Sequence, residues 1–256
     1  MPIISYQNWM KETKAGPLTP RSPELKAIDE ALRRYEAEGK GVKLLINLKK
    51  ALDGWIRAKG PGWRTSVRNK NRVVENFVSA VDALLVNLQL EVPLVGQKEG
   101  YDAKPLMQPN AQGKQAKHGF MACWYAAAAM VSYYYRPGPR LGLPELWRGD
   151  KGLTVAAIDE LVQVEGLKVV PKPTAGLTSD SVRDLLIQHG PIWAAGYYID
   201  GHPTAGHAIV LTGVSPTMIH YNDPWEPRKK QRDQAWVDAK LLNIPKVLLA
   251  KDPSRY

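Results

Sequence analysis

The sequence contains one cysteine, Cys123, which stands directly before a tryptophan and a run of small apolar residues. A single cysteine excludes an intramolecular disulfide and a zinc site built from several cysteines. The apolar run predicts a closely packed helix from Cys123 to Tyr135, with the thiol in its first turn. Free backbone N–H groups and the helix dipole favour a thiolate there, and the Cys123 N–H can donate to an oxyanion. Cys123 is therefore a candidate nucleophile, with a buried structural cysteine as the alternative.

A thiolate nucleophile needs a general base, which in most enzymes is a histidine. The chain offers five histidines: His118, His189, His202, His207 and His220. His207 stands apart because it follows the small residues Ala205 and Gly206 and begins an apolar strand predicted to reach Val214. A histidine at the start of a rigid core strand is held well for proton transfer. His207 is the predicted base.

An imidazole base also needs an acceptor for its second ring nitrogen. After His207 the chain is predicted to turn near Gly213 and to return as a second strand ending at Tyr221. This hairpin brings the next residues back to the level of His207. Asp223 is the predicted orienting residue, with Asn222 as an alternative. The competing interpretation of Asp223 is purely structural: an Asx turn that only closes the strand.

These motifs, in this order, resemble those of papain-like cysteine peptidases. They are Ala122-Cys123-Trp124, Gly206-His207-Ala208 and Asp223-Pro224-Trp225. Papain has a Cys-Trp at the head of its central helix, a His-Ala strand and an Asn-Ser-Trp turn. Aspartate in place of that asparagine is similar to a compact bacterial branch, which includes bacteriocin-leader peptidases and effector proteases of plant pathogens. The resemblance covers roughly residues 104–226 and is strongest to the papain-like toxin domains of interbacterial effectors.

The resemblance implies an α+β fold in which a central helix packs on an antiparallel sheet. It also implies a Cys123–His207–Asp223 triad: the thiolate attacks a carbonyl, His207 relays the proton and Asp223 holds the imidazole tautomer. The substrate cleft is expected to be lined by Gly206, by Trp193, which could equally be a core residue, and by Trp225. The loop 141–147 is a further candidate lining segment.

The same resemblance implies a glutamine ahead of the cysteine that stabilises the oxyanion. Gln108 has the matching local sequence Leu-Met-Gln-Pro-Asn, but it lies farther ahead of Cys123 than the family pattern places this residue. Gln112 and Gln115 stand at shorter spacing. Gln108 is our prediction, and the other two glutamines stay open.

The predicted elements change character along the chain, which indicates two domains. Three amphipathic helices, at about residues 23–38, 42–59 and 72–90, predict a helical domain over residues 1–95. A loop-like stretch follows, and residues 96–256 are predicted to form the peptidase domain. Its predicted helices, residues 123–135, 154–165 and 179–189, precede strands at 191–199, 207–214, 217–221 and 246–250, which is an α+β order.

Composition excludes several classes of protein. The net charge of +10 is dispersed along the chain, and a nucleic-acid binder would gather it on one face, so nucleic acid is not the expected partner. The longest apolar run, from Ala122 to Tyr135, is too short to span a bilayer. The N-terminus lacks the pattern of a signal peptide. No cofactor and no metal are expected.

The prediction from sequence is a cysteine endopeptidase that acts as a secreted interbacterial effector toxin. The helical domain loosely resembles the leading domain of effectors exported by contact-dependent systems such as type VI secretion. The protein would be made in the bacterial cytoplasm and exported without a signal peptide into a target cell. Expected partners are a protein substrate there, a cognate immunity protein, and a secretion component or chaperone. The alternatives are deamidase or transglutaminase-type acyl transfer by the same triad, and an inactive papain-like binding module.

Overall fold

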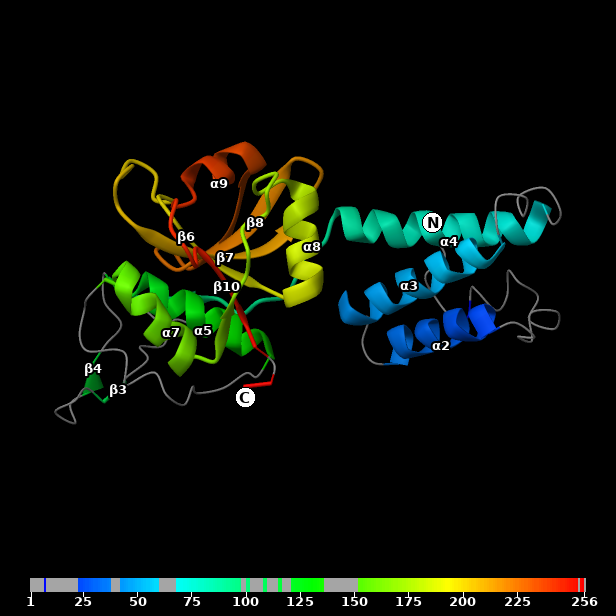
Figure 1. Ribbon diagram of the computed structural model, residues 1–256, viewed down its shortest axis with the longest axis horizontal. Coiled ribbons are helices and arrows are strands. Elements are labelled where there is room, and N and C mark those ends of the chain that lie inside the picture. Colours follow the sequence, from blue (N-terminus) through cyan, green and yellow to red (C-terminus); the bar gives the residue numbers. More distant parts are fainter. Residues whose placement is uncertain are drawn as a thin grey trace. The chain divides into compact units, whose positions relative to one another are not determined.

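The computed structural model describes residues 7, 23–37, 42–59, 68–97, 100–101, 108–109, 115–116, 121–135, 152–252 and 254–255, and structural statements refer to these residues. The chain divides into two compact units, Met1–Asn87 and Leu88–Tyr256 (Figure 1). Each unit is described by itself.

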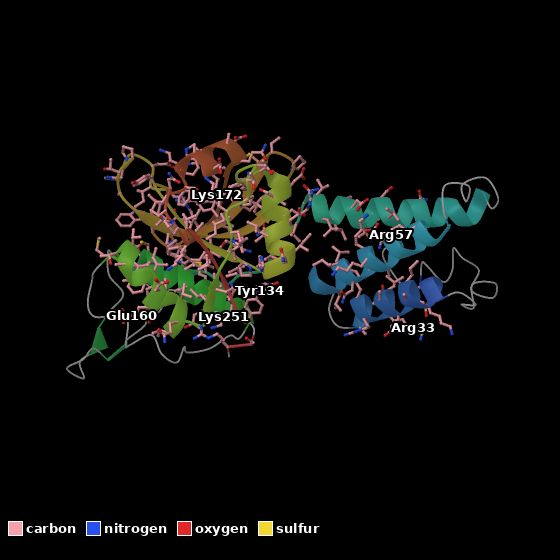
Figure 2. All side chains as sticks on the ribbon, in the orientation of Figure 1. Arg33, Arg57, Tyr134, Glu160, Lys172 and Lys251 are labelled. Carbon is pink, nitrogen blue, oxygen red and sulfur yellow. The ribbon has the colours of Figure 1, made fainter. Side chains whose placement is uncertain are left out.

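The first unit is helical, as the amphipathic patterns predict. Its helices are α2 (Pro23–Ala37), α3 (Val42–Lys59) and α4 (Arg68–Val86), and α3 packs against both of the others. Their apolar stripes are buried, with Ile28, Leu32, Leu48 and Leu52 fully so. Charged side chains such as Arg33 lie on the exposed sides of the helices (Figure 2).

The second unit is built on a six-stranded antiparallel sheet, in the order β5-β10-β6-β7-β8-β9. The strands are β5 (Leu167–Val169), β6 (Ile192–Gly196), β7 (His207–Val214), β8 (Met218–Asp223), β9 (Arg228–Asp233) and β10 (Leu248–Lys251). The helical elements are α5 (Cys123–Tyr135), η2 (Val155–Ala157), α7 (Ile158–Val164), α8 (Ser179–His189) and α9 (Gln234–Lys240). Two short hairpins, β1–β2 (Val95–Gly96 and Gly100–Tyr101) and β3–β4 (Gln108–Pro109 and Gln115–Ala116), complete the described elements. The predicted α+β fold is confirmed.

Helix α5 is the central element of this unit. Its alanines Ala126–Ala129 have no exposed surface, and small side chains let the helix approach β6, β7 and β10 closely (Figure 1). Every residue of β6 and β7 is buried, which requires cover on both faces of the sheet. The helices that pack on these two strands are α5 and α8.

Residues 88–97, here called the strap, tie the start of the second unit to the sheet. The Leu90 N–H donates to the Thr212 carbonyl at 2.8 Å, and the Val214 N–H donates to the Leu88 carbonyl at 2.8 Å. The strap runs so close to β7 that a Cβ on Gly213 would lie 2.6 Å from the Leu88 carbonyl oxygen. The two units therefore divide at Leu88, eight residues before the boundary expected from composition.

The sequence patterns did not predict the short strands β1 to β4, nor β5, β9 and α9. Strand β9 has the sequence Arg-Lys-Lys-Gln-Arg-Asp and lies at the edge of the sheet, where it lacks the apolar alternation of a half-buried strand. The predicted helix at 154–165 is a 3₁₀ turn followed by α7, and the Thr154 side chain makes no capping hydrogen bond. None of the helices in the described ranges is long and apolar enough to cross a membrane.

Candidate active site

The three residues of the predicted triad each lie at the end of a regular element. Cys123 is the first residue of α5, where the Ala126 N–H donates to the Ala122 carbonyl at 2.9 Å and closes the first turn. His207 is the first residue of β7, and Asp223 is the last residue of β8. Because β7 and β8 pair antiparallel, the end of β8 returns to the start of β7. The fold thus brings residues far apart in sequence to one place.

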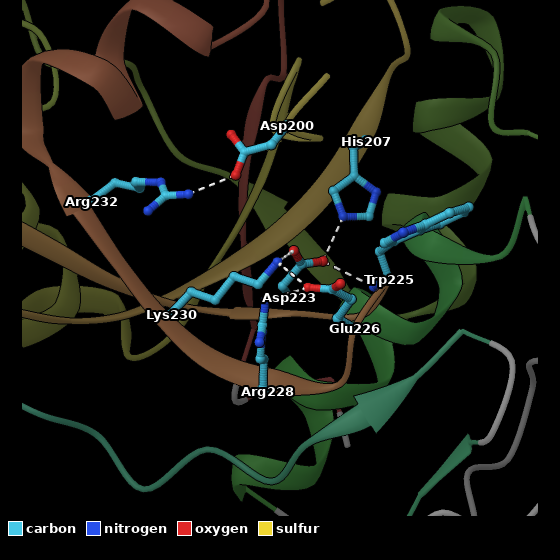
Figure 3. A network of polar contacts seen from close by, with 8 residues as sticks. All are labelled: Asp200, His207, Asp223, Trp225, Glu226, Arg228, Lys230 and Arg232. Carbon is cyan, nitrogen blue, oxygen red and sulfur yellow. Dashed lines mark hydrogen bonds and ion pairs between the residues drawn. The ribbon is translucent and has the colours of Figure 1, made fainter. Parts of the chain in front are cut away.

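His207 and Asp223 form a buried hydrogen-bonded pair (Figure 3). His207 Nε2 lies 2.8 Å from Asp223 Oδ1, and the two side chains are 1% and 3% exposed. Asp223 also accepts from the Trp225 N–H at 2.9 Å and from Lys230 Nζ at 2.6 Å. Asn222 takes no part in this network, because its amide Nδ2 donates to the Val92 carbonyl of the strap at 3.1 Å. Of the two neighbours, Asp223 is therefore the one bound to His207.

Cys123 hydrogen-bonds to the same histidine. Because Nε2 of His207 is engaged by Asp223, the ring nitrogen left for the sulfur is Nδ1. Burial lowers the pKa of His207, but hydrogen bonds to Asp223 and Cys123 and the charges of both groups outweigh it and raise the pKa to about 9. Burial also acts to raise the pKa of Asp223, yet hydrogen bonds from His207, Lys230 and the Trp225 N–H hold it below its ordinary value.

Cys123 and His207 open into a cavity of about 470 Å³. Much of its wall is aliphatic: Leu153, Val155, Ile158, Ile199, Leu242 and Ile244. The three predicted substrate-binding residues, Gly206, Trp193 and Trp225, also line it. A Cβ on Gly206 would meet no atom within 4 Å, so this backbone borders open space. Trp193 is buried, and its indole Nε1 donates to the Trp124 carbonyl at 3.1 Å, so it braces α5 as well as lining the cavity.

Gln97, which sequence reasoning passed over, lines the same cavity. It is the last residue of the strap and is 1% exposed. Its backbone N–H donates to the Pro224 carbonyl at 2.9 Å, which fixes it beside the turn that carries Asp223. The sequence gives little signal for it, because a long segment separates Gln97 from Cys123 and its place depends on the backbone bond to Pro224.

The three glutamines considered from sequence are not brought to the site by any described contact. Gln108 and Gln115 lie in the β3–β4 hairpin, where the structure describes the backbone but not the side chains. Gln112 and the loop 141–147 lie outside the described residues. The prediction for Gln108 therefore stays a prediction. Within the described ranges, no group of three or more His, Cys, Asp or Glu side chains could hold a metal ion.

A thiol, an imidazole and a carboxylate linked in this order form the arrangement used for nucleophilic acyl transfer. The cavity supplies a place for a substrate next to the sulfur, largely screened by apolar side chains. The chemistry available to the site is attack of Cys123 on a carbonyl carbon, with His207 as the proton carrier.

The raised pKa of His207 predicts a distinctive pH profile for alkylation of Cys123. Iodoacetate is an anion, so the imidazolium should attract it, and the rate should fall as the pH rises through about 9, where His207 loses its proton. In His207→Ala the rate should instead rise steadily with pH, as for an ordinary thiol. Peptide mapping by mass spectrometry reports the rate at Cys123, the one cysteine of the chain. Identical profiles for the two proteins would contradict the pairing of Cys123 with His207.

Comparison with known families supports the same chemistry. Residues 107–241 match the family model described as papain-like cysteine protease AvrRpt2, a bacterial effector. The match spans 135 of the 256 residues (107 to 241) and contains Cys123, His207 and Asp223. Proteases of such an effector family act on protein substrates. The chain belongs to the AvrRpt2 family of papain-like cysteine proteases.

Proposed function

We propose that the protein is an endopeptidase in which Cys123, His207 and Asp223 form the catalytic triad. The Cys123 thiolate attacks the peptide carbonyl, His207 gives its proton to the leaving amine, and a thioester remains. Water then attacks the thioester while His207 takes its proton, which frees the carboxylic acid product and restores the thiolate and the protonated His207. The observation that carries the proposal is the buried His207, bonded to Asp223 on one nitrogen and facing Cys123 with the other.

Gln97 is our candidate for the side-chain donor to the oxyanion, together with the Cys123 N–H. It lies in the same cavity as Cys123 and His207, and a glutamine amide can donate to a developing negative charge. Its backbone bond to Pro224 holds it on a rigid turn, as an oxyanion donor requires. Gln108 remains the competing candidate from sequence.

The cavity also supports a preference in the substrate. Its aliphatic walls favour a bulky apolar side chain close to the scissile bond. The open space at Gly206 leaves room for the substrate backbone to pass beside the catalytic histidine.

The biological role that we propose is that of an effector toxin exported into a target bacterium, without a signal peptide, by a contact-dependent system such as type VI secretion. Membership of a bacterial effector family supports delivery to a target cell. A producer of such a toxin needs an immunity protein that blocks the site, and export needs a secretion component or chaperone. The helical first unit is a candidate for that export contact.

Peptide cleavage by Cys123 should be visible in a survey of new protein N-termini. A whole-cell lysate treated with the protein should gain N-termini that are missing after treatment with Cys123→Ala, and residues beside the cuts should be enriched in bulky apolar types. Acyl transfer of the deamidase or transglutaminase kind would instead change the mass of glutamine residues without cutting chains. That result, or equal cleavage by both proteins, would overturn the peptidase proposal.

Substitution of Gln97 separates oxyanion stabilisation from activation of the thiol. Gln97→Ala should lower kcat for peptide cleavage by about 100-fold, because one oxyanion donor is lost. Alkylation of Cys123 by iodoacetate should keep its rate, since that displacement creates no oxyanion. Gln108→Ala serves as the matched comparison. If Gln108→Ala loses the activity and Gln97→Ala keeps it, Gln108 is the donor.

Toxicity can be tested by expression in bacteria that lack a protective partner. Cells that make the protein in the cytoplasm should stop growing, whereas cells with equal amounts of Cys123→Ala should grow normally. Equal growth of both strains would remove the antibacterial toxin role and would leave the peptidase activity to be judged by cleavage.

A further inference from the structure

Oδ2 of Asp223, the carboxylate oxygen that does not bond to His207, accepts a hydrogen bond from a lysine of the neighbouring strand (Figure 3). Asp223 Oδ1 faces His207 and the Trp225 N–H, and Asp223 Oδ2 accepts from Lys230 Nζ at 2.6 Å. Lys230 lies on β9 opposite Tyr221 of β8, and its side chain is only 19% exposed. Its ammonium therefore sits at the back of the catalytic pair, away from the sulfur.

The other basic residues of β9 lack this position. Arg228, Lys229 and Arg232 pair with Glu226, Glu91 and Asp200, and all of these side chains are at least 44% exposed. Exposed pairs of this kind contribute little to stability and are screened by salt. Lys230 alone among the four binds a buried catalytic carboxylate. This contrast makes Lys230 a functional residue in what looks, in the sequence, like a run of surface charge.

Two physical effects follow from the contact. A carboxylate fixed at both oxygens cannot rotate, so Oδ1 stays aimed at His207 Nε2. The ammonium also offsets the carboxylate's charge at short range in a poorly solvated site, where charges interact strongly. Without it, Asp223 would act on the imidazolium with its whole negative charge.

We propose that Lys230 is a positioning residue of the catalytic site, which orients Asp223 and offsets its charge so that His207 releases its proton more readily. The inference rests on the triad proposed above. The Asp223–Lys230 pair then presents to the imidazole an oriented acceptor that is nearly neutral overall.

Several other charged or titratable groups surround the pair, and the variants used in a test must leave these residues unchanged. Glu226 is the nearest, with Oε2 at 3.0 Å from Lys230 Nζ and 2.6 Å from Arg228 Nη2. The remaining ones are Cys123 from α5, Tyr221 from β8, His202 from the cavity wall, and the Arg232–Asp200 pair. None of them bonds to Asp223 Oδ2 in the described contacts, so Lys230 is the residue to change.

The test is the pH profile of Cys123 alkylation by iodoacetate in the full-length protein. In Lys230→Met the alkaline limit of the reaction should move to higher pH by about half a pH unit or more, because the uncompensated carboxylate holds the imidazolium longer. Lys230→Arg keeps the charge and should retain the wild-type limit. Lys229→Met removes a neighbouring charge on the same strand and should leave it unmoved. A titration of the His207 ring protons by NMR should give the same order without a reagent.

The direction of the change distinguishes this role from simple packing. Loss of packing alone would free Asp223 from His207 and move the alkaline limit down, so a limit that moves down or stays in place in Lys230→Met overturns the inference. If that variant does not fold, Lys230→Gln, which keeps a donor but no charge, decides by the same criterion. Failure of the triad itself gives a different signature, since wild type and His207→Ala would then react alike.

Discussion

The buried hydrogen bond between His207 and Asp223 is the interaction on which the site depends. A carboxylate that is 3% exposed cannot stay ionised without donors that replace water. Asp223 has three, the imidazole of His207, the Trp225 N–H and the ammonium of Lys230, and they come from β7, from the turn after β8 and from β9. Three neighbouring parts of the sheet thus each supply a donor to one buried charged group.

The rest of the second unit positions this pair against the thiol. Helix α5 can place Cys123 beside His207 only because its alanines let it lie close to β6 and β7. The strap adds a second constraint: it bonds to β7 at Leu88 and Leu90, to Asn222 at Val92, and to Pro224 at Gln97. The strap therefore connects β7, near the shift in its register with β8 between Leu211 and Gly213, to both the turn that carries Asp223 and the cavity. A deletion made at the boundary expected from composition would remove most of it.

Much of this site was predictable because its signals are local. The apolar run after Cys123 and the strand after His207 gave helix and strand bounds that the structure reproduces. Asp223 followed from the length of one hairpin. Gln97 was not predicted from the sequence, because a long segment separates it from Cys123 and its place depends on a backbone bond to Pro224. Lys230 was not predicted for another reason. Strand β9 has no apolar alternation and forms only by pairing with β8, so its charged residues resemble a solvated surface in the sequence.

The most direct test of the account is the pre-steady-state reaction of the protein with an excess of p-nitrophenyl acetate. Attack by Cys123 should release p-nitrophenolate in a burst equal to the amount of enzyme and leave one acetyl group on Cys123, found by peptide mapping. The burst should be slowed strongly in His207→Ala and in Asp223→Ala, because the thiolate loses its charged partner or that partner's orientation. A burst of equal rate in wild type and His207→Ala, or acetyl groups elsewhere, would contradict the claim that the buried pair activates Cys123.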